Sequence, residues 1–170
     1  MNRRHSKFVV ATISAMFGVA AGSAFAAEVT DTFDVRIVIE NSCVINSGQT
    51  TDMDFNTQQL LSSNFDAQSA IGVTCTTDLP YTIGLSAGDN ATGGTNTRRM
   101  ANAGDTAFVA YDLYQDVSGG AHWGNDIGTD TKGATGTGAA QTHTVYGRVA
   151  SQTTPPAGAY EDTITVTVDY

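Results

Sequence analysis

Two cysteines, Cys43 and Cys75, are the residues of this chain with the most predictable chemistry. The amino-terminal residues have the features of an export signal, and one cysteine pair in an exported chain is typical of one disulfide bond. Two cysteines cannot form a cysteine-rich zinc site, and no Cys-x-x-Cys motif is present. The bond would close a loop of about 32 residues and stabilise the fold by roughly 3–4 kcal/mol. We therefore expect a structural role for both cysteines.

Residues for acid–base or nucleophilic catalysis are few. Beyond the export signal only His122 and His143 remain as histidines. A Ser-His-Asp triad could be composed from the residue types present, but this is true of nearly any chain. The sequence has no His-Glu-x-x-His zinc helix and no phosphate-binding glycine loop. We therefore predict no catalytic residue, and we expect that the protein is not an enzyme.

Two further candidates for ligand binding lie close together in the sequence. Asp126 and Asp130 flank a glycine-bearing loop, but their spacing does not match an EF-hand calcium loop. Trp123 is a possible stacking platform for a sugar, although a lone tryptophan beside a turn glycine is more often a packing residue. We predict no metal site and no cofactor.

The first 26 residues have the pattern of a cleaved secretory signal. A basic segment with Arg3, Arg4 and Lys7 precedes a mostly apolar run over residues 8–21, and an Ala-x-Ala cleavage site ends at Ala26. The apolar run is shorter than the roughly 20 residues that a membrane-spanning helix needs. We predict export, cleavage and no membrane span.

Cleavage would leave 144 of the 170 residues, enough for one domain with its own core. This mature chain would have 5 basic against 17 acidic residues, a net charge of −12. Proteins that bind nucleic acid need basic patches, so this class is disfavoured, and anionic lipid surfaces are disfavoured for the same reason. A solvated acidic surface is the simpler interpretation.

The two ends of the mature chain both have the alternation of a strand. Phe33, Val35, Ile37 and Ile39 would share one face near the amino terminus. At the other end the apolar residues of the alternation are Ile164, Val166, Val168 and Tyr170. A spare strand at the start, in a chain that stops on a strand, suggests a sheet edge that another molecule completes.

Between these ends the sequence predicts short strands that glycine-rich turns separate. The predicted strands are 71–75, Pro80–Leu85, 97–101, 108–114, 142–149 and 163–169. Residues 56–65 could hold a short turn of helix, and 128–141 are predicted to be a long surface loop. Many short strands of this kind indicate an antiparallel sandwich or barrel.

Several segments together resemble the spore coat protein U domain, the domain of archaic chaperone–usher pilus subunits, including the major subunit. The most specific segment is the carboxy-terminal run over residues 156–170, Pro-Ala-Gly-Ala-Tyr-Glu-Asp-Thr-Ile-Thr-Val-Thr-Val-Asp-Tyr. The run over residues 144–149, the Tyr-Asp-Leu-Tyr of 111–114 with the later Trp123, and the two cysteines fit the same family. The resemblance covers essentially all of the mature chain.

The resemblance implies an incomplete immunoglobulin-like sandwich that lacks its last strand and is completed by donor-strand complementation. Residues 27–41 would be the donor segment, with Phe33, Val35, Ile37 and Ile39 entering a neighbour, and residues 42–170 the pilin domain. Ile164, Val166, Val168 and Tyr170 would border the acceptor groove. The implied partners are a periplasmic chaperone, an outer-membrane usher and further copies of the chain. The implied location is a cell-surface pilus that supports attachment and biofilm formation.

Three other interpretations remain open at this point. The chain could be a minor or tip subunit, although the mature length leaves no room for an additional binding domain. It could be a self-complete secreted β-sandwich that binds a ligand such as a carbohydrate, with residues 33–39 paired inside its own domain. It could also be a spore or cyst coat protein that assembles by related strand pairing.

Overall fold

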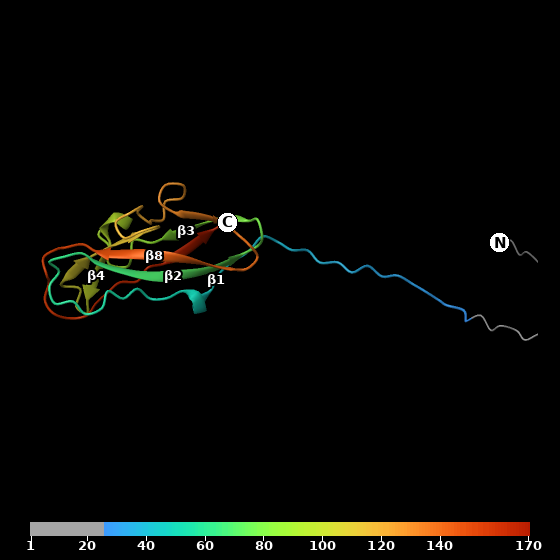
Figure 1. Cartoon of the computed structure of the whole chain (residues 1–170), viewed down its shortest axis with the longest axis horizontal. Coiled ribbons are helices and arrows are strands. Elements are labelled where there is room, and N and C mark those ends of the chain that lie inside the picture. Colours follow the sequence, from blue (N-terminus) through green and yellow to red (C-terminus); the bar gives the residue numbers. More distant parts are fainter. Residues whose placement is uncertain (1–25) are drawn as a thin grey trace, which may run out of the picture. The chain divides into compact units, whose positions relative to one another are not determined.

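The computed structural model describes residues 26–170, in which residues 43–170 form ten strands (Figure 1). In chain order these are β1 (Cys43–Ile45), β2 (Phe65–Cys75), β3 (Pro80–Leu85), β4 (Arg99–Asn102), β5 (Phe108–Ala110), β6 (Asp112–Tyr114), β7 (Lys132–Thr135), β8 (Ala140–Val149), β9 (Tyr160–Glu161) and β10 (Val166–Asp169). Two single 3₁₀ turns, η1 (Ser47–Gln49) and η2 (Thr95–Thr97), complete the assigned elements. The predicted signal over residues 1–26 lies outside the described residues except for Ala26.

The strands form three antiparallel sheets, in the orders β1-β2-β8-β6, β10-β3-β7 and β5-β4-β9. The longest pairing joins β2 to β8 over ten residues, from Phe65 opposite Val149 to Thr74 opposite Ala140. No α-helix occurs in residues 26–170, so the prediction of an all-β protein is confirmed.

One hydrophobic core lies between the first two sheets. The four-stranded sheet contributes Val73 and Val145, and the β10-β3-β7 sheet contributes Ile83 and Leu85. Trp123 is fully buried in the same core, and its indole N–H donates a hydrogen bond of 2.8 Å to the carbonyl of Ile83. Trp123 is therefore a packing residue, and the alternative of an exposed sugar platform is wrong.

Several predicted segments differ from the observed ones. Residues 56–65 contain no helical turn. The predicted strand over 108–114 divides at Tyr111, because β5 joins the β4 sheet whereas β6 joins β8. The predicted loop over 128–141 contains β7, which pairs with β3.

Residues 26–42 contain no strand or helix in the structure. The side chains of Phe33, Val35, Ile37 and Ile39 are each 77–87% exposed. The segment also contains an ion pair between Arg36 and Asp34. Within residues 26–170, no helix has the length and hydropathy needed to span a membrane.

Candidate functional site

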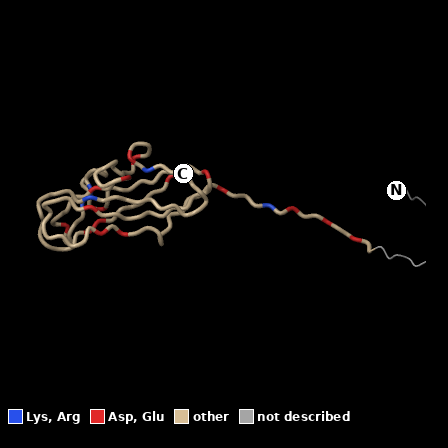
Figure 2. The backbone as a smooth tube through the Cα atoms, viewed as in Figure 1, with Lys and Arg blue, Asp and Glu red and all other residues tan. Residues whose placement is uncertain are grey.

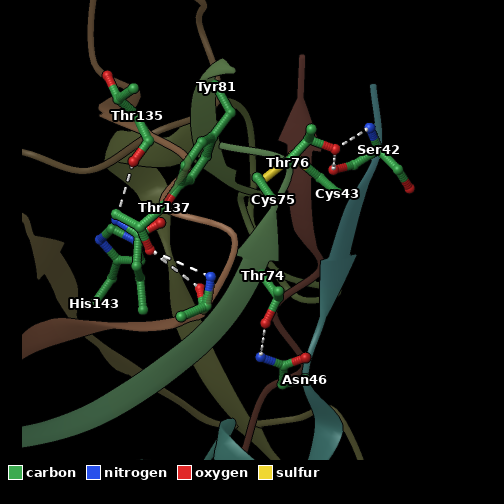
Figure 3. The surroundings of a disulfide bond; sticks show 12 residues. Ser42, Cys43, Asn46, Thr74, Cys75, Thr76, Tyr81, Thr135, Thr137 and His143 are labelled. Carbon is green, nitrogen blue, oxygen red and sulfur yellow. Dashed lines mark hydrogen bonds between the residues drawn. A yellow bond between two sulfur atoms is a disulfide. The ribbon is translucent and has the colours of Figure 1, made fainter. Parts of the chain in front are cut away.

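The disulfide between Cys43 and Cys75 joins the first residue of β1 to the last residue of β2 (Figure 3). The two residues are direct partners in the β1–β2 register. Ser42 and Thr76 extend this junction, because the Ser42 N–H donates to Thr76 Oγ1 at 3.0 Å and the Thr76 N–H donates to the Ser42 carbonyl at 2.9 Å. The predicted disulfide is confirmed, and it fixes the point where the amino-terminal segment enters the domain.

The carboxy-terminal strand β10 is an edge strand. One side of β10 pairs with β3, from Val166 opposite Leu85 to Asp169 opposite Thr82, and no strand of residues 26–170 pairs with its other side. Alternate residues from Tyr160 to Val168 are partly buried, and Ile164, Val166 and Val168 pack against the core. The free side of this strand is one wall of a groove.

The segment that follows η1 is the opposite wall. Thr51 is held to β2 in two ways: its N–H donates to the carbonyl of Ala70, and its hydroxyl accepts from the Ala70 N–H, both at 3.0 Å. Beyond it, Met53 and Phe55 turn half-buried side chains toward the core, while Asp52 and Asp54 are exposed. The apolar side chains of this alternation, Met53 and Phe55, therefore pack toward the core, whereas Asp52 and Asp54 lie at the exposed margin of the groove.

Two connected hollows follow the segment after η1: one of about 460 Å³ between this segment and β10, and one of about 700 Å³ between it and residues 154–161. They share Met53, Phe55, Met100, Tyr160 and Glu161, so they are parts of one groove, here called the apolar groove. Core residues form the floor of the smaller hollow: Ile71, Leu85, Tyr111, Leu113 and Val145. The smaller hollow therefore reaches the hydrophobic core beside the free side of β10, although each of these floor residues is at most 9% exposed.

The structure places two of the four carboxy-terminal candidates at this groove. Ile164 and Val166 line the smaller hollow, and Val168 packs against the core further along β10. Tyr170 follows the end of β10, is 61% exposed and lines neither hollow. Met53 and Phe55 were not among the predicted site residues, although their period-2 alternation with Asp52 and Asp54 is a sequence signal for them.

Thr95, His122 and Asp112 lie in a row that superficially resembles a catalytic triad. His122 Nε2 lies 3.0 Å from Thr95 Oγ1, and Nδ1 lies 3.3 Å from Asp112 Oδ1. The Asp112 contact lacks hydrogen-bond geometry, so the carboxylate does not orient the imidazole as a triad requires. Thr95 is only 9% exposed and lines neither hollow. This arrangement lacks an accessible nucleophile.

Residues 84–88 have the spacing Gly-x-Ser-x-Gly, which in hydrolases presents a nucleophilic serine. Here the hydroxyl of Ser86 accepts hydrogen bonds from the N–H groups of Gly88 and Thr165, at 3.3 and 2.9 Å. No histidine of the described chain bonds it, and no helix follows the strand as in the hydrolase elbow. The Ser86 hydroxyl therefore holds the backbone of the loop and is not placed to act as a nucleophile. Residues 26–170 also contain no group of three His, Cys, Asp or Glu residues placed to hold a metal ion.

Comparison with known proteins places these features in a family context. Residues 29–167 match the family model described as the Spore Coat Protein U domain. Protein U of Myxococcus xanthus is 30% identical over 176 residues, which cover 96% of this chain and 98% of that protein.

Among solved structures, the chain is similar to one in the CsuC–CsuE chaperone–tip adhesion subunit pre-assembly complex from archaic chaperone-usher Csu pili of Acinetobacter baumannii. The TM-score is 0.55 and the sequence identity 27%, over 78% of this chain. The match spans 40% of the length of the solved chain.

Proposed function

The chain belongs to the Spore Coat Protein U domain family, and we propose that it is the shaft subunit of a pilus that assembles by donor-strand exchange. In this proposal residues 27–41 of one copy complete the domain, residues 42–170, of the next copy. The role is structural and not enzymatic, and the fibre supports surface attachment and biofilm formation.

The observation that carries the proposal is the presence of two complementary features in one chain. Residues 33–39 present an apolar face of strand length that is exposed to solvent. The domain has an apolar groove beside an edge strand with an unpaired side. An apolar groove beside a free edge is an aggregation hazard unless a strand covers it. A second copy of the same chain can supply that strand.

The size and energetics of the two features are compatible. Residues 33–39 span roughly 20 Å as a strand, at about 3.3 Å per residue. Burial of Phe33, Val35, Ile37 and Ile39 would contribute about 6–12 kcal/mol, at roughly 1.5–3 kcal/mol for each side chain, before ordering costs. Because groove and donor are different surfaces, each added copy exposes a new donor or a new groove. Such a head-to-tail contact does not close, and it therefore forms a filament.

A periplasmic chaperone and an outer-membrane usher are the further partners in this proposal. The chaperone would protect the apolar groove before assembly by adding a strand to the free side of β10. The resemblance to a chain from a chaperone–subunit complex of Csu pili supports this part of the proposal. Export through the periplasm to the cell surface follows from the same assembly route.

Substitution of one donor residue tests the proposal. Ile37→Asp places a charge where the neighbour's groove is apolar, so this subunit should fail to polymerise while it still binds its chaperone through an intact groove. Asp34→Ala, on the other face of the donor segment, is the matched control and should polymerise normally. Electron microscopy of surface fibres measures polymerisation, and co-purification measures chaperone binding.

Two results would contradict the proposal. The first is normal fibre assembly by the Ile37→Asp subunit. The second is an assembled fibre in which residues 33–39 pair only within their own domain, as expected for a self-complete binding module.

A spore or cyst coat protein is the second candidate, favoured by the description of the family that the chain matches. The same strand exchange could build a coat layer. Imaging of the assembled protein on cells distinguishes the two, because a pilus projects from the surface as thin fibres whereas a coat follows the cell outline.

A further inference from the structure

Residues 162–165 form part of the apolar groove without belonging to a sheet. They lie between β9 and β10, and Asp162, Thr163 and Ile164 line the smaller hollow. In the described chain, residues 162–164 make no backbone–backbone hydrogen bond. The segment nevertheless keeps the extended alternation of the strands on either side, with Asp162 and Ile164 partly buried. Side chains must therefore hold this part of the rim.

Asp162 is the first point of attachment. Its Oδ2 accepts a hydrogen bond of 2.7 Å from the hydroxyl of Tyr111. Its Oδ1 accepts from the N–H of Asn90 at 3.2 Å and from the Asn90 side-chain amide at 3.0 Å. The Asn90 amide also donates to the carbonyl of Glu161 at 3.2 Å. One carboxylate thus ties the rim both to the groove floor and to the loop that follows β3.

Tyr111 donates its hydrogen bond to Asp162 as a neutral phenol, and its surroundings keep it neutral. Tyr111 is 9% exposed, and burial together with the hydrogen bond to Asp162 raises the pKa of its hydroxyl far above the ordinary value. The phenol therefore stays protonated and donates at every physiological pH. The ring also lines the smaller hollow, so a residue of the groove floor directly holds the rim.

Ser86 is the second point of attachment. Its N–H donates to the carbonyl of Thr165 at 3.0 Å, and its hydroxyl accepts from the Thr165 N–H at 2.9 Å. The carbonyl of Ser86 in turn accepts from Arg98 Nε and Nη2, at 2.9 and 2.7 Å. Arg98 is 1% exposed and also donates to the carbonyl of Leu85 at 2.9 Å. A buried guanidinium therefore fixes the residue that holds the end of the rim.

From these contacts we infer that Tyr111, Asp162, Asn90, Ser86 and Arg98 form a polar clamp that keeps the rim of the groove extended while the groove is empty. The inference rests on the proposed function, in which a donor strand must enter this groove. If the rim were disordered, only the fraction of molecules with an ordered rim could accept a donor strand. The apparent affinity for the donor strand would then be the intrinsic affinity multiplied by that fraction. Tyr111 and Asp162 are positioning residues in this scheme.

The first test measures the rim without any donor, by hydrogen–deuterium exchange on the mature full-length chain. Tyr111→Phe keeps the ring but removes the bond to Asp162, so exchange of the two bonded amides at the rim, Asn90 N–H on Asp162 and Thr165 N–H on Ser86, should become several-fold faster. Asp162→Asn keeps the shape and one acceptor oxygen, and it should have a smaller effect than Asp162→Ala. Unchanged exchange of the Asn90 and Thr165 amides in the Tyr111→Phe chain would overturn the inference.

Tyr81→Phe is the matched control for Tyr111→Phe. Tyr81 is also a buried tyrosine, and its hydroxyl lies 2.8 Å from Nε2 of His143 (Figure 3), but it lines neither hollow. Each substitution removes one phenolic hydroxyl and one hydrogen bond. Only the Tyr111 substitution should accelerate exchange of the Asn90 and Thr165 amides. Equal acceleration by both would indicate general loosening of the domain and would contradict the polar clamp.

The second test measures donor entry into the full-length Ile37→Asp chain, which cannot donate, with a labelled peptide of residues 31–41. Tyr111→Phe in this background should slow association about 5-fold or more and leave the dissociation rate nearly unchanged, while Tyr81→Phe changes neither. An unchanged association rate would overturn the inference. Absence of peptide binding to the Ile37→Asp chain itself would instead reject the proposed function, and the exchange experiment would still decide whether the polar clamp orders the rim.

Discussion

At the scale of a single residue, Gly88 lies directly against the Asp162 carboxylate of the polar clamp. Its φ of +86° is a conformation that side-chain-bearing residues rarely adopt, and a β-carbon at this position would overlap the carboxylate of Asp162. A side chain here is therefore unfavourable for two independent reasons. The loop that carries Asn90 to Asp162 depends on this glycine.

We expect Gly88→Ala to destabilise the domain by about 1–3 kcal/mol, because the backbone is strained and Asp162 must move. Urea denaturation followed by tryptophan fluorescence measures the effect, with Trp123 as the reporter. Gly158→Ala is the control, since a β-carbon at Gly158 meets no atom within 4 Å. Equal stability of the two variants would show that Asp162 moves aside without cost.

The pair of His143 and Tyr81 predicts a dependence of stability on pH. Burial and, to a lesser extent, nearby Lys132 hold the pKa of His143 below the ordinary value of 6.5. The unfolded chain therefore binds more protons than the folded chain near this pH. Stability should be fully present above about pH 6.5 and should decrease as the pH falls below it. His143→Gln should flatten this decrease when unfolding free energies are compared at pH 7.5 and 5.5. An unchanged slope would contradict the prediction.

At the scale of the elements, strands whose own residues alternate could be predicted, and strands defined by their partners could not. Pro80–Leu85 was predicted with the bounds that β3 has in the structure. In contrast, β7 has the sequence Lys-Gly-Ala-Thr, with little intrinsic strand preference, and it exists because it pairs with β3. The break at Tyr111 likewise depends on which sheet each half joins.

The residues of the candidate site also divide into those that a local sequence pattern predicts and those that depend on distant parts of the chain. The apolar face of residues 33–39 and the inward face from Ile164 to Val168 are periodic patterns that a sequence displays. The groove floor and Tyr111 depend on residues far apart in the chain that the fold brings together, such as Met53 and Tyr160, which line the same hollow. The clamp on Asp162 joins residues 51 and 72 positions apart, so no local pattern reports it.

At the scale of the elements, we predict that loss of the disulfide between β1 and β2 lowers the yield of the protein. Cys75→Ser frees β1 from its covalent link to β2, and the chain-entropy estimate for a loop of this length is about 3–4 kcal/mol. This is a large share of the 5–15 kcal/mol stability of a typical domain, so the periplasmic yield should fall. Immunoblotting of periplasmic extracts measures the yield. The Cys43→Ser, Cys75→Ser double variant should fall equally, and a normal yield of both would contradict a stabilising role.

At the scale of the whole molecule, charge opposes association between copies. Acidic residues are spread over both the amino-terminal segment and the domain (Figure 2). If residues 1–26 are removed, each copy has a net charge of −12, so two copies repel each other at long range. Close-range burial of apolar side chains must overcome this repulsion.

The repulsion predicts that salt accelerates polymerisation. Raising the ionic strength from about 0.01 M to about 0.1 M shortens the Debye length from roughly 30 Å to roughly 10 Å. The rate at which the mature chain polymerises, followed by light scattering, should increase several-fold over this range. Sucrose at matched osmolality is the control and should leave the electrostatic repulsion in place. Slower assembly at higher salt would indicate that local attraction between opposite charges outweighs the repulsion of the net charges.

The position of the disulfide has a mechanical consequence for a fibre under tension. A pull on residues 33–39 enters the domain at Cys43, and the covalent bond transfers the load directly to Cys75 at the end of β2. From there the ten-residue pairing with β8 distributes the force into the core. Residues 46–64, which include the groove wall at Met53 and Phe55, connect β1 to β2 inside the loop that the disulfide closes. In the proposed fibre, the disulfide would therefore let the load bypass the groove wall that contacts the other neighbour.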